Sequence, residues 1–347
     1  MNVRAWLVIL LLGLPLPGLA QGFAGLGSDA AGFTLPTPDR VLEFPADHGA
    51  HPAFRIEWWY LTANMTGPDR TPYGLQWTLF RSALAPRDGE GWEAPQLWMG
   101  HAAVTTPTAH IVAERLARGG IGQAGVTALP FAAWIDDWAM TGPDFDRLRL
   151  TASGADFAYD VELRARGPLV LHGRNGYSVK SGEGQASHYY SQPAFDLSGT
   201  LTLPEGEVPV TGTAWLDREW SSQPLSQDQT GWDWFSLSFD SGDRLMGFVL
   251  RGQDDYTSAT WIGADGEVTA FADGAFEVRP LTWHEVAGRS VPVDWQVWLP
   301  ERGVDVTVRA LNRNAWMETS VPYWEGPVTI AGSHAGVGYL EMTGYGD

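Results

Sequence analysis

The sequence predicts an all-β fold built from two antiparallel β-barrels in series. Three observations favour this fold. Short segments with alternating hydrophobicity follow one another along the chain, 41 glycines and 23 prolines provide frequent turns, and several segments recur in the same order in the second half. A chain of 347 residues, with 44% hydrophobic and 18% charged residues, is long enough to bury two cores.

Two segments before the first predicted strand are assigned to export and to a linker. Arg4 precedes a short apolar run over residues 6–14, and a prolyl break and small residues then lead to Ala20. This pattern is typical of a signal peptide over residues 1–20, so we expect cleavage after Ala20 and a periplasmic protein; an amino-terminal anchor that is retained is the alternative. Residues 21–40 are rich in Gly, Ala, Ser and Pro without periodicity, which predicts a linker.

The predicted strands begin near Val41. Alternation is clear in residues 157–164, where Tyr159, Val161 and Leu163 share one face. Residues 240–243 and 264–267 are predicted hairpin turns, with glycine where a positive φ is needed. Only residues 109–118 have a weakly helical pattern. The predicted strands are residues 55–65, 74–83, 97–105, 148–152, 157–164, 199–203, 210–216, 232–239, 244–251, 257–262, 294–299 and 304–310.

An imperfect internal repeat divides the predicted strands into two sets. Five blocks recur in the same order, which is harder to attribute to chance than any one match. We therefore predict a first barrel over residues 41–223 and a second over residues 224–347. The first has the longer insertions, so it is the better place for a site. The matching blocks are 57–61 with 233–237, 79–81 with 249–251, 98–100 with 261–263, 161–165 with 306–310, and 212–217 with 336–341.

The composition excludes several classes of function. A net charge of -19 disfavours nucleic acid and anionic membrane surfaces as partners. The chain has no cysteine, which excludes disulfides, thiolate zinc sites, cysteine nucleophiles and a lipoprotein anchor. A glycine-rich phosphate loop and a Gly-x-Ser-x-Gly motif are also absent. The 18 tryptophans instead favour a large core, an aromatic-lined cavity, or both.

Residues 187–234 have the highest density of side chains that can take part in chemistry. Asp217, Arg218 and Glu219 stand in a row between tryptophans, and His188 precedes them. A strand with one apolar face does not need three such charges, so the row predicts a partly buried polar network. Such a network marks either a functional site or an arginine–carboxylate clamp that pins one barrel to the next. Both remain open for Arg218 and Glu219, whereas the site is favoured for His188 and Asp217.

A wider set of aromatic and acidic residues predicts a pocket for an apolar ligand at a barrel mouth. A carboxyl group buried among indoles keeps its proton, and aromatic faces stabilise a cation by roughly 0.5–2 kcal/mol per contact. Such a pocket would therefore suit an acid-catalysed step through a carbocation. The set consists of Trp58, Trp59, Tyr60, Trp77, Tyr189, Tyr190, Trp215, Trp232 and Trp234, with Glu57, His188, Asp217, Arg218 and Glu219.

Other histidines are assigned structural roles. His48 and His51, with Asp47 before them and Glu57 after them, are spaced as metal ligands could be. Hydrogen-bonding loop histidines are the preferred interpretation, so we predict no metal site and no cofactor. His101 lies in an apolar segment and is interpreted as a core histidine.

The motifs around these residues resemble those of the AttH-like proteins, relatives of the carotenoid 1,2-hydratases (hydroxyneurosporene synthases). The resemblance covers nearly the whole predicted mature chain and is looser for the hydratases themselves. The matching blocks are residues 47–52 (DHGAHP), 57–62 (EWWYLT), 186–193 (ASHYYSQP), 215–223 (WLDREWSSQ), 231–235 (GWDWF) and 338–345 (GYLEMTGY).

This resemblance implies two lipocalin-like barrels and, for a hydratase, addition of water to an isoprenoid double bond without a cofactor. The hydratases' functional pattern, His-x-Trp followed by Tyr-x-Asp, falls on His188 with Tyr190 and on Trp215 with Asp217. Asp217 is then the expected general acid, and His188 is expected to hold or activate the water. The expected ligand-binding residues are Tyr190, Trp215, Trp58, Trp59, Tyr60, Trp77, Trp232 and Trp234, beside a polar network of Glu57, Arg218 and Glu219.

Two other classes of function remain open. The resemblance also implies a possible association with an ABC transporter, in which case the protein is a non-catalytic periplasmic carrier of an isoprenoid or lipid. A pure interaction module would leave Asp217 and His188 in a structural clamp. A ligand that gains one water on incubation with the protein would indicate the enzyme, and an unchanged ligand would indicate the carrier.

Overall fold

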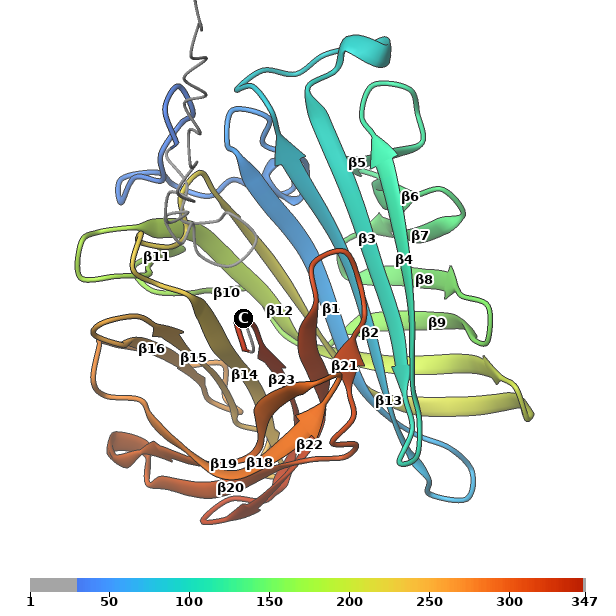
Figure 1. Cartoon of the computed structure of the whole chain (residues 1–347), viewed down its shortest axis with the longest axis vertical. Helices are drawn as coiled ribbons and strands as arrows, with labels where there is room; N and C mark the ends of the chain where they lie inside the picture. Colours follow the sequence, from blue (N-terminus) through green and yellow to red (C-terminus); the bar gives the residue numbers. More distant parts are fainter. Residues whose placement is uncertain (1–29, 346–347) are drawn as a thin grey trace, which may run out of the picture.

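The computed structural model describes residues 30–345, and two curled antiparallel sheets make up this part of the chain (Figure 1). The predicted signal peptide lies outside the described residues. Of the predicted linker, residues 30–40 are described, and they are attached to the first barrel. The Thr34 amide donates to the Ala53 carbonyl at 3.0 Å, and the Ser222 hydroxyl donates to the Thr34 carbonyl at 2.5 Å. In the described part of the chain, no helix is long and apolar enough to cross a membrane.

The first sheet has the strand order β4-β3-β2-β1-β13-β12-β9-β8-β7-β6-β5, with the short strands β10 and β11 paired to β12. A short 3-10 turn, Ala46–His48, precedes it. Its strands are β1 (Ile56–Thr66), β2 (Pro72–Ala83), β3 (Gln96–Thr105), β4 (His110–Arg118), β5 (Ala124–Ala128), β6 (Phe131–Ile135), β7 (Trp138–Asp144), β8 (Arg147–Ser153), β9 (Ala158–Ala165), β10 (Val170–Leu171), β11 (Tyr177–Val179), β12 (Ala186–Leu203) and β13 (Gly206–Ser221).

The second sheet has the order β17-β16-β15-β14-β23-β22-β20-β19-β18, with β21 paired to β22. The predicted boundary at residues 223–224 falls in the segment between β13 and β14. The strands of the second sheet are β14 (Gly231–Phe239), β15 (Arg244–Arg251), β16 (Tyr256–Ile262), β17 (Val268–Phe271), β18 (Glu277–Val286), β19 (Arg289–Leu299), β20 (Val304–Ala310), β21 (Trp316–Met317), β22 (Tyr323–Gly332) and β23 (Gly336–Met342).

The two sheets have equivalent topologies, which confirms the predicted pair of barrels. Strands β14 to β17 follow one another as β1 to β4 do, and β23, β22, β20, β19 and β18 take the places of β13, β12, β9, β8 and β7. The blocks 79–81, 161–165 and 212–217 match their counterparts in mutual register. The block 57–61 is displaced by two residues, because Asp217 pairs with Tyr60 whereas its counterpart Glu341 pairs with Trp234. The block 98–100 is also displaced along its strand.

The prediction of a helix near residues 109–118 is wrong. These residues form β4, which pairs with β3 along its whole length from His110 opposite Thr105 to Arg118 opposite Leu97. The β-branched Ile111 and Val112 suit a strand, and the completed hairpin satisfies the backbone groups that a helix would otherwise pair locally. Ten of the twelve predicted strands, in contrast, lie within observed ones, and the other two, residues 55–65 and 157–164, begin one residue before β1 and β9.

Alternating residues of each sheet fill the barrel interiors. Trp59 and Trp77, which were expected to bind ligand at a barrel mouth, are fully buried in the core of the first barrel. Trp58 and Tyr60, one position away from Trp59, point to the other face of the sheet and meet the second barrel. A third apolar cluster therefore joins the two barrels. It contains Tyr60, Val170, Tyr189, Trp215, Leu225, Trp234, Met246, Phe248, Leu250, Ile262 and Tyr339.

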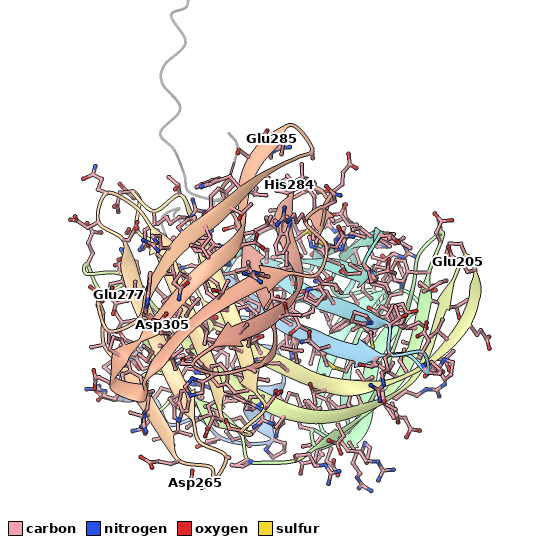
Figure 2. All side chains as sticks on the ribbon, turned by 90° about the horizontal axis from the view of Figure 1, so that it is seen from below. Glu205, Asp265, Glu277, His284, Glu285 and Asp305 are labelled. Atoms are coloured by element: carbon pink, nitrogen blue, oxygen red, sulfur yellow. The ribbon has the colours of Figure 1, made fainter. Side chains whose placement is uncertain are left out.

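The surface charge is concentrated in exposed carboxylates. Glu205, Asp265, Glu277, Glu285 and Asp305, labelled in Figure 2, are all exposed. Acidic residues can carry the net charge of -19 at this surface without a desolvation penalty. Buried carboxyl groups are a separate population and require their own explanation.

Candidate active site between the two barrels

A cavity of about 330 Å³ lies between the barrels, rather than at the mouth of either one. Its walls are largely aromatic and aliphatic, with a few ionisable groups among them, as is typical of small-molecule sites. The second sheet contributes residues from β14, β15, β22 and β23. The lining residues are Ile56, Trp58, Tyr60, Thr78, Phe80, Ser82, Leu97, Trp98, Met99, His101, Leu116, Lys180, Tyr189, Asp217, Glu219, Pro224, Leu225, Trp232, Trp234, Phe248, Leu250, Val321, Tyr323, Glu341 and Thr343.

The three charged residues 217–219 of β13 are divided between the two faces of the strand, because successive side chains alternate in direction. Asp217 and Glu219 line the cavity, and Trp215 on the same face donates a hydrogen bond to Asp217. Arg218 and Trp220 point into the first barrel instead. Successive side chains of a strand point to opposite faces, so this separation follows directly from the extended backbone.

Asp217 is held by three donors in a buried position. The Tyr189 hydroxyl donates to Oδ2 at 2.6 Å, the Trp215 indole donates to Oδ1 at 2.6 Å, and the Ser191 hydroxyl also donates to Oδ1. Burial raises the pKa of Asp217 to about 7, although these donors act in the opposite direction. A carboxyl group with this pKa can give up a proton at neutral pH.

His172 lies next to this carboxyl group, and nothing in the sequence had singled it out. Its Nε2 is 2.6 Å from the Ser191 hydroxyl and its Nδ1 is 2.9 Å from the Thr260 hydroxyl of the second barrel. Burial lowers the pKa of His172 to about 3, so the ring is neutral. When Asp217 is protonated, it can donate to Ser191, which can then donate to His172. The network therefore provides hydrogen-bond partners for Asp217 both when it is protonated and when it is ionised.

Glu341 is a second carboxyl group of the cavity, on the strand that corresponds to that of Asp217. The Trp232 indole donates to its Oε1 at 2.7 Å. Burial raises the pKa of Glu341 to about 7, and the charge of Asp217 also raises it. A negative charge on either carboxyl disfavours ionisation of the other, so the pair favours holding one proton near neutral pH.

The remaining charged groups of the cavity pair with each other. Lys180 lies 2.8 Å from Glu219, and its ammonium group is 4.2 Å from the centre of the Phe248 ring. The Tyr60 and Trp234 rings meet edge to face with centroids 5.3 Å apart. The aromatic faces and carboxylates together favour positive charge inside the cavity.

His188 and Tyr190 do not share the cavity with Asp217, so the expected cooperation of His188 with Asp217 is wrong. Both lie on the other face of β12. His188 is surrounded by Phe54, Tyr177 and Trp220, and burial lowers its pKa to about 4. The Tyr190 hydroxyl lies 2.7 Å from Nδ1 of His48, inside the first barrel. The side chains that reach Asp217 are those of Tyr189 and Ser191, which alternate with His188 and Tyr190 along β12.

Arg218 and Glu57 form a buried structural clamp. Arg218 donates to Glu57 at 2.5 Å and to the Gly49 carbonyl at 2.5 Å, and its guanidinium group lies 3.7 Å from the Trp59 ring centre. Burial would raise the pKa of Glu57, but the charges of Arg218 and Arg81 hold it well below its usual range. The clamp interpretation therefore holds for Arg218, but it pins the loop before β1 to the first barrel, not one barrel to the other.

The possible metal ligands His51, Asp47 and Glu57 belong instead to the same buried clamp. His51 lies 3.0 Å from Asp47 and 3.0 Å from Glu57, whose carboxylates also bind arginines. His48 turns away to stack on Phe145, with ring centroids 3.9 Å apart. Within residues 30–345, no three metal-binding side chains are grouped as a metal site requires.

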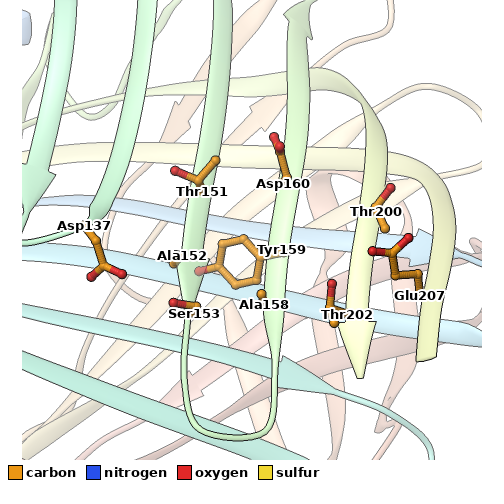
Figure 3. Close-up of a pocket in the computed structure, with 10 residues that line it drawn as sticks. All are labelled: Asp137, Thr151, Ala152, Ser153, Ala158, Tyr159, Asp160, Thr200, Thr202 and Glu207. Carbon is orange, nitrogen blue, oxygen red and sulfur yellow. The ribbon is translucent and has the colours of Figure 1, made fainter. Parts of the chain in front are cut away.

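A polar hollow of about 440 Å³ lies over β8, β9, β12 and β13 of the first sheet (Figure 3). Asp160, Thr200 and Glu207 line it, and Asp160 is already paired with Arg149 at 2.5 Å. Its polar, open lining does not suit an apolar ligand. The cavity between the barrels is therefore the better candidate site.

The sequence profile of the AttH-like family matches residues 35–345. This chain belongs to the AttH-like family. The match includes both barrels and the whole inter-barrel cavity. No curated protein sequence matches the chain.

Three solved structures of other proteins are similar to this member of the AttH-like family. An AttH protein from Nitrosomonas europaea is 34% identical, with a TM-score of 0.81 over 90% of this chain and 100% of that one. Kievitone hydratase from Nectria haematococca is 15% identical, with a TM-score of 0.68 over 90% and 95% of the two chains. CghA, crystallised with Sch210972, is 12% identical, with a TM-score of 0.56 over 90% and 96%. At these low identities, the last two share the fold alone.

Proposed function

We propose that this AttH-like protein binds an apolar, isoprenoid-like molecule between its barrels and adds water to one of its carbon–carbon double bonds. The observation that carries the proposal is Asp217, a buried carboxyl group in the wall of an aromatic cavity. An alkene has no lone pair, so it must be protonated at carbon by a strong, well-placed acid. Asp217 retains a proton near neutral pH because burial raises its pKa to about 7.

The reaction would proceed in two steps. The π electrons of the alkene take the Asp217 proton to form a C–H bond, leaving a carbocation and a carboxylate. The faces of Trp58, Tyr60 and Trp234 line the cavity and would stabilise the cation by roughly 0.5–2 kcal/mol per good contact. Water then forms the C–O bond and loses one proton, so alkene and water become an alcohol.

Two similarities to hydratases support this reaction, but neither identifies its substrate. Trp215 and Asp217 occupy the positions of the Tyr-x-Asp pair of the carotenoid hydratases, with the carboxyl group kept and the aromatic residue exchanged. Kievitone hydratase is named for a hydration and shares the two-barrel fold. A fold hosts many functions, so the proposal depends on the site itself.

A non-catalytic carrier is the second candidate, and one observation favours it. His188 and Tyr190 lie on the face of β12 away from the cavity, so only half of the expected hydratase pattern reaches the site. A carrier would hold an isoprenoid or lipid in the same aromatic cavity and pass it to or from an ABC transporter.

Incubation with isoprenoids in ¹⁸O-labelled water distinguishes the enzyme from the carrier. The probes are a lipid extract of the native host and farnesol, and Asp217→Asn is the matched control. A hydratase would convert a component to a product that is heavier by one labelled water, and the variant would not. Binding without any mass change would support the carrier, and the absence of both binding and turnover would contradict both functions.

Export to the periplasm is the cellular part of the proposal. The residues that suggest it, 1–20, resemble a cleavable signal. Intact-mass measurement of protein from the fractionated native host tests it. We expect a periplasmic chain that begins at Gln21, and a full-length cytoplasmic chain would contradict export.

A further inference from the structure

We propose that the ligand of the cavity is a single extended hydrocarbon chain that lies across five neighbouring strands, and that Met99 and Leu116 determine how long a chain the cavity accepts. The inference deepens the proposed function by naming the shape of the ligand. Only its link to the reaction at Asp217 rests on that function, because the binding of a chain can be measured without turnover.

The floor of the cavity is one cross-strand row of side chains, which we call the middle row. Strands β13, β1, β2, β3 and β4 are consecutive in the first sheet (Figure 1). Residues that lie directly opposite each other on antiparallel strands point to the same face of the sheet. One such set lines the cavity from end to end, and it consists of Glu219, Trp58, Phe80, Met99 and Leu116.

A second row, the inner row, lies two residues away on the same strands and closes one side of this floor. Nδ1 of His101 lies 3.0 Å from the Tyr323 hydroxyl, and Glu114 accepts a hydrogen bond from the Ser320 amide at 3.0 Å. Tyr323 and Ser320 belong to the second barrel, so the two barrels meet along the inner row and the middle row forms a groove beside it. The inner row consists of Asp217, Tyr60, Thr78, His101 and Glu114.

The groove is closed at β13 and open at β4. At the closed end, Lys180 pairs with Glu219 at 2.8 Å, and Phe248 of the second barrel covers them and is itself buried. At the open end, Leu116 is 60% exposed, and Leu97, which also lines the cavity, is 39% exposed. Exposed apolar side chains that continue the wall of an apolar cavity indicate that the ligand extends over them.

The hydrocarbon end of the ligand enters first. The charged groups at the closed end already have partners, because Lys180 pairs with Glu219 and the Trp232 indole donates to Glu341. A polar head group buried there would have to replace these interactions, whereas at the open end it stays in water. The hydrocarbon end of an isoprenoid alcohol therefore lies beside Asp217, where the proposed reaction takes place.

The spacing of the strands sets the length of the chain. Adjacent strands lie about 4.8 Å apart, so the four steps from Glu219 on β13 to Leu116 on β4 span about 19 Å along the sheet. An extended chain advances roughly 1.2 Å per bond, so a main chain of about 15 bonds reaches Leu116. Geranylgeraniol has about this length and farnesol is shorter by one isoprene unit. Geraniol is shorter by two units and ends near Phe80.

Titration of the whole protein with these three alcohols, followed by tryptophan fluorescence, tests the inference. We expect the affinity to rise on the order of 10-fold from geraniol to farnesol and again to geranylgeraniol, because each unit buries more apolar surface. Leu116→Gln should weaken the binding of geranylgeraniol about 5-fold and leave that of geraniol unchanged, because only the longer chain reaches this position. Leu129→Gln is the matched control, since Leu129 is also 60% exposed but does not line the cavity.

Met99→Trp tests the length limit from inside the groove. The larger side chain blocks the middle row between Phe80 and Leu116, and geraniol ends before this block. We expect the affinity for geranylgeraniol to fall on the order of 10²-fold, to that for geraniol, while the affinity for geraniol is kept.

Equal effects of Leu116→Gln on geraniol and geranylgeraniol, including no effect on either, would overturn the inference, as would the absence of binding by all three alcohols. Leu116 is exposed, so this variant is expected to fold even if Met99→Trp disturbs the sheet. Length-dependent binding without any turnover would support the extended chain and remove the hydration. Turnover with an affinity that is independent of chain length would do the reverse.

Discussion

Asp217 and Arg218 are adjacent in the sequence and have opposite surroundings in the structure. Asp217 lies in the aromatic cavity and is held by neutral donors, whereas Arg218 lies inside the first barrel beside Glu57. Burial favours the neutral form of the Asp217 carboxyl group, whereas the buried charge of Arg218 requires a partner of opposite charge. At the scale of single residues, the direction of each side chain therefore decides between acid chemistry and structural pairing.

Replacement of Asp217 by Asn should abolish turnover and preserve binding. The amide has nearly the shape of the carboxyl group and still accepts from the Trp215 indole, but it has no acidic proton. We expect kcat to fall on the order of 10²- to 10⁴-fold, with little change in the affinity for farnesol measured by tryptophan fluorescence. An unfolded variant, or one that loses binding first, would assign Asp217 a structural role instead.

The contribution of Asp217 and Glu341 to the stability of the protein should decrease as the pH rises toward 7. Burial raises the pKa of Asp217 from 3.8 to about 7 and that of Glu341 from 4.5 to about 7. Between the unfolded and folded pKa values the folded state binds more protons, so this stabilisation is complete below about pH 4 and is lost as the pH rises through about 7.

Urea denaturation between about pH 4 and 8 measures this dependence. We expect the free energy of unfolding of the wild type, relative to that of the double variant Asp217→Asn with Glu341→Gln, to decrease over this range, because the variant no longer titrates at these positions. Glu162→Gln, at an exposed position, serves as the control. Parallel curves for the wild type and the double variant would show that the two carboxyl groups are not protonated in the folded state.

Strand β13 is the element that serves both barrel interior and cavity. Its central residues contribute Asp217 and Glu219 to one face and Arg218 and Trp220 to the other. It pairs with β1 and β12, so neighbouring strands fix both faces at once. The clamp on the inner face therefore positions the acid on the outer face through the shared backbone.

Replacement of Arg218 by Met should destabilise the protein more than an equivalent change at the surface. The variant leaves Glu57 buried, with Arg81 as its remaining guanidinium partner, and releases the Gly49 carbonyl. Breaking a buried pair in this way costs about 3–5 kcal/mol. Urea denaturation measures the loss, and limited proteolysis should find the loop before β1 more accessible.

Arg149→Met is the matched control for the clamp. Arg149 pairs with Asp160 on the exposed face of the same barrel, where solvent screens the interaction, so its loss should change stability little. Equal losses in the two variants would mean that the Arg218 clamp contributes no more than a surface ion pair.

The whole molecule is organised around the junction of the two barrels. Tyr60 binds Glu325 and His172 binds Thr260 across this junction, and the cavity lies within it. Neither barrel alone contains both walls of the cavity. The relative position of the barrels is therefore part of the site.

Enlargement of Gly74 should disturb this junction. A Cβ atom at Gly74 would lie 2.5 Å from Pro327 and 2.8 Å from the Tyr339 hydroxyl of the second barrel. Gly74→Val forces these groups apart, and overpacking of this kind costs about 1–3 kcal/mol. We expect a lower Tm and weaker farnesol binding. Gly167→Ala, where a Cβ meets no atom within 4 Å, is the control, and equal behaviour would contradict the tight junction.

The sequence by itself determined the fold class and the two-barrel architecture. Alternation, turns and the ordered repeat are local signals, and all twelve predicted strands correspond to observed ones, two of them beginning one residue early. It also indicated the buried acid, because Asp217 stands among tryptophans with period-two spacing to Trp215 and Glu219. Residues 109–118 were misjudged because their strand is specified by pairing with β3 more than by their own pattern.

Only the tertiary structure decided which residues share the cavity. Glu341 lines the cavity with Asp217, and Ser191 joins Asp217 to His172, although these residues are far apart in the sequence. His188, placed beside Asp217 by motif resemblance, points into the first barrel. The spacing of residues within a motif determines which side chains share one face of a strand. The packing of one barrel on the other determines which strand faces enclose the cavity.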